Sequence, residues 1–150
     1  MPADIQASLT VIGRRQADLD GGKQLDLYKA DLYKAIFRDA NLCGVNMFRV
    51  TLRRAYLKNV DLRQADLRQA DLQGTDLRGA NLQGAELRGA NLEATRLEGA
   101  KLKEAKLKGC HGLIQNQLNL ANQEFLPASL PPGLIFHGCP APKPPPTPPA

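Results

Sequence analysis

The chain has 150 residues, 43% of them hydrophobic, and a formal net charge of +5. This size and composition fit a single folded domain. The charge is too small for a polybasic tail, no stretch offers the ~20 apolar residues of a transmembrane helix, and the first 13 residues lack the pattern of a secretory signal. We therefore expect a cytoplasmic protein that does not bind membranes.

The first 24 residues are predicted to form an N-terminal cap and one irregular repeat. Apolar residues in 4–13 fall on one face of a helix, although 9–12 also reads as a strand. The segment 17–21 has the pattern of the repeats that follow but is out of phase with them.

From residue 25 to residue 109 the chain consists of seventeen five-residue repeats. Leu occupies the central position of each repeat from Leu27 to Leu107, except at Phe37 and Met47. A small or β-branched residue stands two places before the centre, and the residue between them is usually polar. In extended backbone, residues two apart share a face. The central and small residues therefore point inward, and the last two residues of each repeat turn the chain.

Short sides joined by turns of the same sense close into a coil. With turns near a right angle, four repeats complete one coil of 20 residues, and residues 25–109 make slightly more than four coils. Gly fills the second turn position mainly in the later repeats, where it accepts a positive φ at no steric cost. Because Lys29, Lys34, Arg49 and Arg54 fill it earlier, we expect a different turn geometry there.

These repeats resemble a known family. Ala65-Asp66-Leu67-Arg68-Gln69 and Ala80-Asn81-Leu82-Gln83-Gly84 are similar to the tandem unit of the pentapeptide-repeat family, and the resemblance covers 85 of 150 residues. It implies an all-β fold, a right-handed quadrilateral β-helix. The handedness comes from the resemblance, whereas the four-sided coil comes from the spacing.

Residues 110–139 are predicted to form a C-terminal helical cap. Ile114, Leu118, Ala121 and Phe125 have the spacing of an amphipathic helix that would cover the last coil, and Pro127 would end it. Residues 134–136 either tuck against this cap or form a patch for a homodimer. The proline-rich tail, 140–150, is predicted to be disordered.

The sequence offers no catalytic or cofactor motif, so we predict a protein that is not an enzyme and binds no cofactor. Cys110 and His111 lie at the start of the predicted cap, and His137 and Cys139 lie at its end. A zinc site, a Cys110–Cys139 disulfide and unlinked residues are the three alternatives, of which the last is favoured because the ligand spacing matches no common zinc signature. Cys43 is in an outward position and is predicted to be an exposed thiol.

One outward column is the candidate partner face. Residues 20 apart share a column, which places aromatic rings above cations, a composition typical of interaction surfaces. The predicted face consists of Tyr28, Phe48, Arg49, Arg68, Arg88 and Lys108. We therefore predict a binding or scaffold module for an unidentified protein partner.

Two alternatives direct the protein to nucleic acid. One is weak binding through a basic surface made by Arg49, Arg53, Arg54, Lys58, Arg63 and Arg68. The other follows from the resemblance, since some family members that confer quinolone resistance resemble DNA and modulate gyrase. Those surfaces are acidic, whereas the repeats here carry 16 Lys and Arg against 11 Asp and Glu, a net +5.

Overall fold

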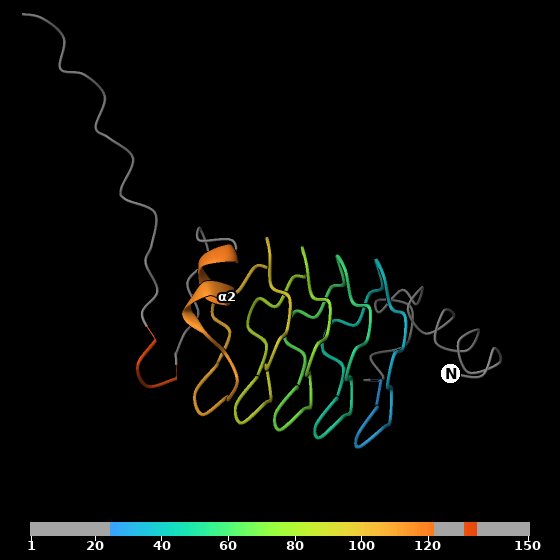
Figure 1. The fold of residues 1–150 in the computed structure, drawn as a ribbon. Helices are drawn as coiled ribbons and strands as arrows, with labels where there is room; N and C mark the ends of the chain where they lie inside the picture. Colours follow the sequence, from blue (N-terminus) through green and yellow to red (C-terminus); the bar gives the residue numbers. More distant parts are fainter. Residues whose placement is uncertain (1–24, 122–130, 135–150) are drawn as a thin grey trace, which may run out of the picture.

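The computed structural model describes residues 25–121 and 131–134. From residue 25 to residue 109 the chain winds into stacked four-sided coils, and one helix, α2 (Gln115–Leu120), lies at the C-terminal end of the stack (Figure 1). Within the described ranges, each extended segment of a coil pairs with its neighbours through isolated β-bridges, and no strand of several residues is formed. Every bridge is parallel and joins residues 20 apart, from Asp26 with Asn46 to Asn91 with His111. Four repeats therefore complete one coil, as the spacing predicts.

The register defines four coils and four faces, named here for the rest of the text. Coil 1 is 25–44, coil 2 is 45–64, coil 3 is 65–84 and coil 4 is 85–104, followed by one more repeat. Face 1 contains the repeats centred on residues 27, 47, 67, 87 and 107. Face 2 is centred on 32, 52, 72 and 92, face 3 on 37, 57, 77 and 97, and face 4 on 42, 62, 82 and 102.

The core is the column of central side chains inside the coil. All of them from Leu32 to Leu107 are buried, and the Ala and Val residues two places earlier pack beside them. The inward position also accepts Thr75 and Thr95, whose hydroxyls donate hydrogen bonds to the carbonyls of Leu52 at 2.7 Å and Leu72 at 2.9 Å. A buried hydroxyl needs such a partner, and the preceding coil supplies it.

The turns are alike in both halves, which corrects the predicted difference in geometry. The φ angles at Lys29, Lys34, Arg49 and Arg54 lie between 54° and 59°, close to the 66° to 72° of the turn glycines from residue 74 onward. In both halves the next repeat donates an N–H to the carbonyl of the central residue. Hydrogen bonds between coils, such as Lys29 N to Phe48 O at 3.0 Å, hold the corner in place. This ladder outweighs the roughly 1–2 kcal/mol that a side chain costs in left-handed backbone.

The apolar spacing predicts a helix that continues through Ala121, and the described helix stops one residue before it. Helix α2 ends at Leu120, and Ala121 has extended backbone with φ −67° and ψ 162°. Leu118 and Ala121 are buried as predicted, but Ile114 is 58% exposed. The reason is that Ile114 has the extended backbone of a residue that precedes a helix, and Leu113 occupies the buried position instead.

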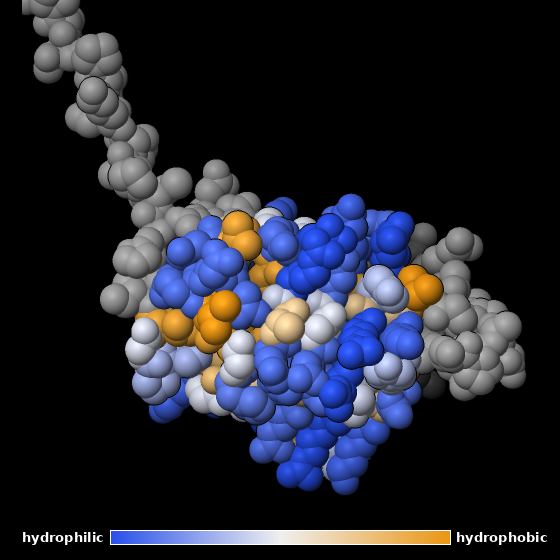
Figure 2. All heavy atoms as spheres, viewed as in Figure 1, coloured by the Kyte–Doolittle hydropathy of each residue, from blue (hydrophilic) through white to orange (hydrophobic). Residues whose placement is uncertain are grey.

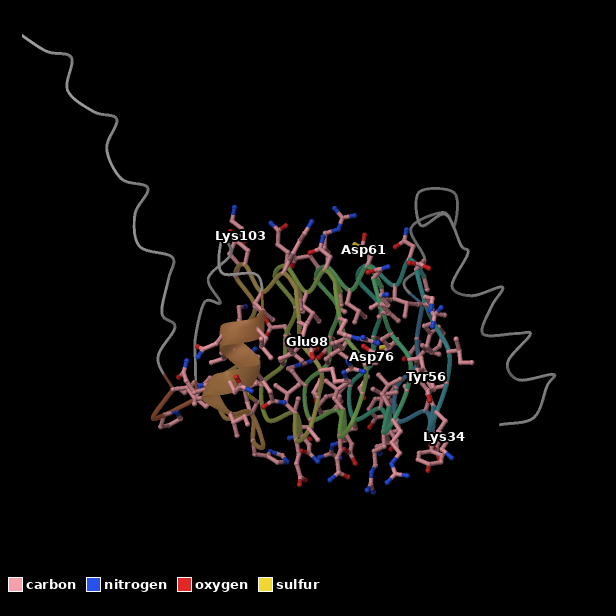
Figure 3. The ribbon with its side chains drawn as sticks, turned by 45° about the horizontal axis from the view of Figure 1, so that its top comes forward. Lys34, Tyr56, Asp61, Asp76, Glu98 and Lys103 are labelled. Atoms are coloured by element: carbon pink, nitrogen blue, oxygen red, sulfur yellow. The ribbon has the colours of Figure 1, made fainter. Side chains whose placement is uncertain are left out.

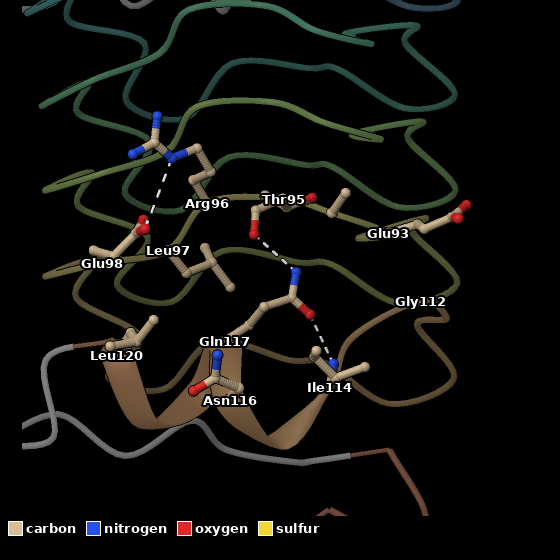
Figure 4. Close-up of a pocket in the computed structure, with 11 residues that line it drawn as sticks. Glu93, Thr95, Arg96, Leu97, Glu98, Gly112, Ile114, Asn116, Gln117 and Leu120 are labelled. Carbon is tan, nitrogen blue, oxygen red and sulfur yellow. Dashed lines mark hydrogen bonds and ion pairs between the residues drawn. The ribbon is translucent and has the colours of Figure 1, made fainter.

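Gln117 seals the end of the coil column (Figure 4). Its side-chain amide donates hydrogen bonds to the carbonyls of Leu92 at 3.0 Å and Thr95 at 2.8 Å, and its carbonyl accepts one from Ile114 N at 2.7 Å. The equivalent carbonyls one coil earlier, Leu72 O and Thr75 O in coil 3, accept hydrogen bonds from coil 4. Their donors are the hydroxyl of Thr95 and the backbone N–H of Arg96. Among the described residues no further coil follows coil 4 on this side, and the single amide group of Gln117 supplies the two hydrogen bonds that a further coil would donate to Leu92 O and Thr95 O.

Several predictions concern residues outside the described ranges. They are the N-terminal cap and irregular repeat in 1–24, the helix limit at Phe125 and Pro127, the ligands His137 and Cys139, and the tail 140–150. The homodimer patch also falls mostly there, although Leu134 is described and packs partly buried against the core. In the part that is described, no helix has the length and apolar character to cross a membrane.

Candidate interaction face

The structure brings the residues of the predicted partner face together on face 1. Tyr28, Phe48, Arg68, Arg88 and Lys108 occupy equivalent positions in successive coils, one place after the central residue. Arg49 lies beside them at the corner, where its Nε donates to Gln69 Oε1 at 2.7 Å. The parallel register fixes this column, because each coil repeats the same backbone path.

The N-terminal half of the column is a stack of rings and cations. The rings of Tyr28 and Phe48 are stacked with centroids 5.9 Å apart and planes 20° from parallel. The Lys29 ammonium lies 4.9 Å from the centroid of Tyr28, and the guanidinium carbons of Arg49 and Arg68 lie 5.3 and 5.2 Å from that of Phe48. Such cation–π contacts are worth about 0.5–1 kcal/mol at exposed sites. They favour positions of the cations over the rings.

The C-terminal half of the column is a ladder of internal ion pairs. Arg68 binds Asp66 through two hydrogen bonds of 2.8 and 2.6 Å, and Arg88 Nη2 lies 2.8 Å from Glu86 Oε2. Lys106 also hydrogen-bonds Glu86. Arg68 and Arg88 are therefore each paired with a carboxylate of the chain, and Lys106 shares Glu86 with Arg88, so this half has four basic residues against two acidic ones.

The same pairing occurs on face 3, which lies opposite face 1, and it shifts the carboxyl pKa values. Asp76, on face 3, binds Arg78 at 2.7 and 2.6 Å. The hydrogen-bonded guanidinium lowers the pKa of Asp76, as Arg68 lowers that of Asp66, and the hydrogen bond from Lys106 lowers that of Glu86. Each of these groups is more acidic in the folded chain than in the unfolded one.

These lowered pKa values predict acid sensitivity. A carboxyl whose pKa is depressed by folding contributes stability above its unfolded pKa, about 3.9 for Asp and 4.3 for Glu, and loses that contribution as the pH falls through its native pKa. We expect the urea midpoint to be constant from pH 7 to about pH 5 and to fall below it. In Asp66→Asn/Asp76→Asn this fall should be shallower. An equal pH slope in parent and variant would contradict the prediction.

The structure does not bring together the residues of the proposed nucleic-acid surface. Arg49 and Arg68 lie on face 1, Arg53 and Arg54 on face 2, Lys58 on face 3 and Arg63 on face 4. Arg63 and Arg68 are engaged with Asp61 and Asp66, and Arg53 Nε lies 3.7 Å from Asp71. The six residues therefore wind around the column and make no single basic face.

The cysteines have the inward and outward positions that the repeats assign to them. Cys110 is a buried free thiol, and burial raises its pKa to about 11, so it is a poor nucleophile and metal ligand at neutral pH. Cys43 is half-buried and not fully exposed as predicted, and its backbone N–H donates to Asn41 Oδ1. Among the residues with described positions, no group of three or more His, Cys, Asp or Glu side chains is arranged to hold a metal ion.

A groove between α2 and coil 4 was missed by the sequence reasoning. It has a volume of about 450 Å³ and is lined by Leu97, Ile114 and Leu120 together with Arg96 and Glu98 (Figure 4). Apolar side chains gather beside α2 on an otherwise mainly hydrophilic face (Figure 2). The groove was missed because Ile114 was assigned to the core, whereas it and Leu120 are exposed.

Comparison with known proteins shows which family of repeats these five-residue units match. Residues 23–47, 46–84 and 76–111 match the family model described as pentapeptide repeats, in eight copies. A solved pentapeptide repeat protein from Nostoc is 36% identical, with a TM-score of 0.56, over 66% of this chain and 78% of that chain. Another, from the thylakoid lumen of Arabidopsis thaliana, is 27% identical, with a TM-score of 0.48, over 71% of this chain and 79% of that chain. None of the curated proteins matches this chain. The four-sided coil is thus a right-handed quadrilateral β-helix.

Proposed function

Because the chain belongs to the pentapeptide-repeat family, whose members are generally non-enzymatic structural and interaction proteins, we propose that it is a binding or scaffold module that presents face 1 to a protein partner. The observation that carries the proposal is the stack of Tyr28 on Phe48 with the cations of Lys29, Arg49 and Arg68 around the rings. Exposed aromatic and Arg side chains that are already ordered lose little entropy on binding, which favours their use as anchors.

The charge of face 1 supports an acidic partner. Its outward and corner positions carry six basic and three acidic residues, a net +3 of the +5 in the repeats. The basic residues are Lys29, Arg49, Arg68, Arg88, Lys106 and Lys108, and the acidic residues are Asp26, Asp66 and Glu86. Such a surface opposes mimicry of DNA, which requires the opposite sign. The cytoplasmic location and a homodimer through the C-terminal cap stay predictions.

A cross-linking pull-down from cells of the source organism tests the proposal. The variant Tyr28→Ala/Phe48→Ala removes both rings of face 1, and Ile36→Ala/Tyr56→Ala removes two large apolar side chains from one column of face 3 as a matched control. We expect the first variant to lose a partner that the parent and the control both retain. If the face 1 variant keeps every partner of the parent, face 1 is not the binding surface.

A further inference from the structure

We infer that the partner is recognised through an acidic protein segment, which binds two stacked stretches of coils 1 and 2, residues 28–34 and 48–54. These stretches cross face 2 from its corner with face 1 to its corner with face 3, and the bridge between Asp31 and Thr51 holds them side by side. We call them the basic stretches. The inference rests on the proposed function and deepens it, because it extends the contact from the corner of face 1 across face 2 and assigns the binding energy to coils 1 and 2.

The first observation is where the charge is concentrated. The basic stretches contain five basic residues and one acidic residue, a net +4, out of +5 for the repeats. The equivalent stretches below them, 68–74 and 88–94, each contain one basic and one acidic residue and are neutral. The five basic residues are Lys29, Lys34, Arg49, Arg53 and Arg54, and the acidic residue is Asp31. A compact positive area on a flat wall attracts a segment of opposite charge.

The second observation is that the cations are held in place. Lys29 and Lys34 lie 4.9 and 5.1 Å from the ring centroids of the tyrosines that precede them, and Arg49 lies 5.3 Å from that of Phe48. Each of the three cations follows its ring directly in the sequence, at a turn position with φ between 54° and 59°. The backbone therefore turns each cation back over the preceding ring. A carboxylate can approach these cations from the solvent side without reordering them.

The third observation separates a protein partner from a nucleic acid. Single-stranded nucleic acids bind such surfaces by stacking bases on exposed aromatic faces. Here Tyr28 and Phe48 stack on each other, and cations lie over these two rings and over the ring of Tyr33. The rings of Tyr28 and Phe48 thus already contact each other and cations, and a cation lies over one face of Tyr33, whereas the charges remain on the surface. Acidic side chains fit this arrangement better than bases do.

The test measures binding of a fluorescein-labelled peptide of ten glutamates to the full chain by fluorescence anisotropy at low salt. We expect binding that weakens steeply with added salt. The variant Lys29→Gln/Lys34→Gln/Arg54→Gln should bind about tenfold more weakly.

The control Lys101→Gln/Lys103→Gln/Lys108→Gln removes the same charge near the other end of the column, and its affinity should change less than about twofold. Figure 3 shows Lys34 and Lys103 toward opposite ends. Circular dichroism checks that both variants are folded.

Three outcomes would overturn the inference. They are equal losses of affinity in the two lysine variants, a larger loss in the control, and tighter binding of a ten-nucleotide deoxythymidine strand than of the peptide. Failure of the proposed function is distinguishable. If the Tyr28→Ala/Phe48→Ala variant loses its partner in the pull-down while the peptide shows no preference for the basic stretches, face 1 binds a partner by other chemistry.

Discussion

Replacing Leu72 by Ala should lower the free energy of unfolding by about 2–5 kcal/mol, because it removes buried methyl groups and leaves a cavity in a closed column. Leu72 is fully buried in coil 3, between Leu52 and Leu92 of the same face. The coils above and below are fixed by backbone hydrogen bonds, such as Leu72 N to Asn91 O at 2.9 Å. The walls therefore cannot move inward to fill the space.

Equilibrium urea unfolding, followed by far-ultraviolet circular dichroism, measures this loss. Leu72→Met keeps the volume and should cost less than about 1.5 kcal/mol. Leu72→Arg should yield no folded protein, because the interior offers no partner for a buried charge. A cost near that of a surface substitution for Leu72→Ala, within about 0.5 kcal/mol, would mean that Leu72 does not line the axis of the coil.

Replacing Gln117 by Glu should destabilise the C-terminal end by about 1–3 kcal/mol. The side-chain amide donates to Leu92 O and Thr95 O, and a carboxylate would present an oxygen to both carbonyls instead. Thr95 O then loses its donor in a half-buried site, at about 1–3 kcal/mol for an unsatisfied group, whereas Leu92 O keeps the N–H of Thr95 at 3.1 Å. The coils closest to the cap should be affected before coils 1 and 2, because a solenoid transmits stability between neighbouring coils.

Native-state hydrogen exchange separates the local effect from a global one. The amide of Gly99, which donates to Leu120 O at 2.8 Å, should exchange much faster in Gln117→Glu, whereas amides of coil 2 should change little. Asn116→Asp makes the same chemical change at the exposed neighbouring position, and its effect should stay within about 0.5 kcal/mol. Equal effects of the two variants would show that charge on α2, and not the lost donors, is responsible.

The coil and its register could be predicted because they depend on a periodic pattern. Seventeen repeats agree on the inward position of the central residue, so an exception such as Met47 does not disturb the phase. Columns followed from the same period, and the structure places Phe48 beneath Tyr28 as expected. The residues of the predicted partner face could therefore be identified as neighbours before any contact was known.

What could not be predicted depends on single residues. The sequence cannot show that Lys29 adopts a positive φ, since that angle is imposed by the hydrogen bonds of the next coil. Ile114 fits a helical apolar face by spacing alone, but its extended backbone exposes it. The compensation of Arg68 by Asp66 also depends on side-chain geometry. The structure, and not the spacing, therefore shows which cations of the column are paired within the chain.

The twenty-residue register sets a rule for changes in length. Adding or removing one whole coil between residue 55 and the cap keeps the basic stretches and α2 on the same sides of the column, about 4.8 Å further apart or closer together. Adding a single five-residue repeat moves every later residue to the next face of the column. The basic stretches and α2 then no longer lie on the same sides relative to each other. Gain or loss of repeats can therefore reorient the basic stretches relative to α2 while the core packing stays the same.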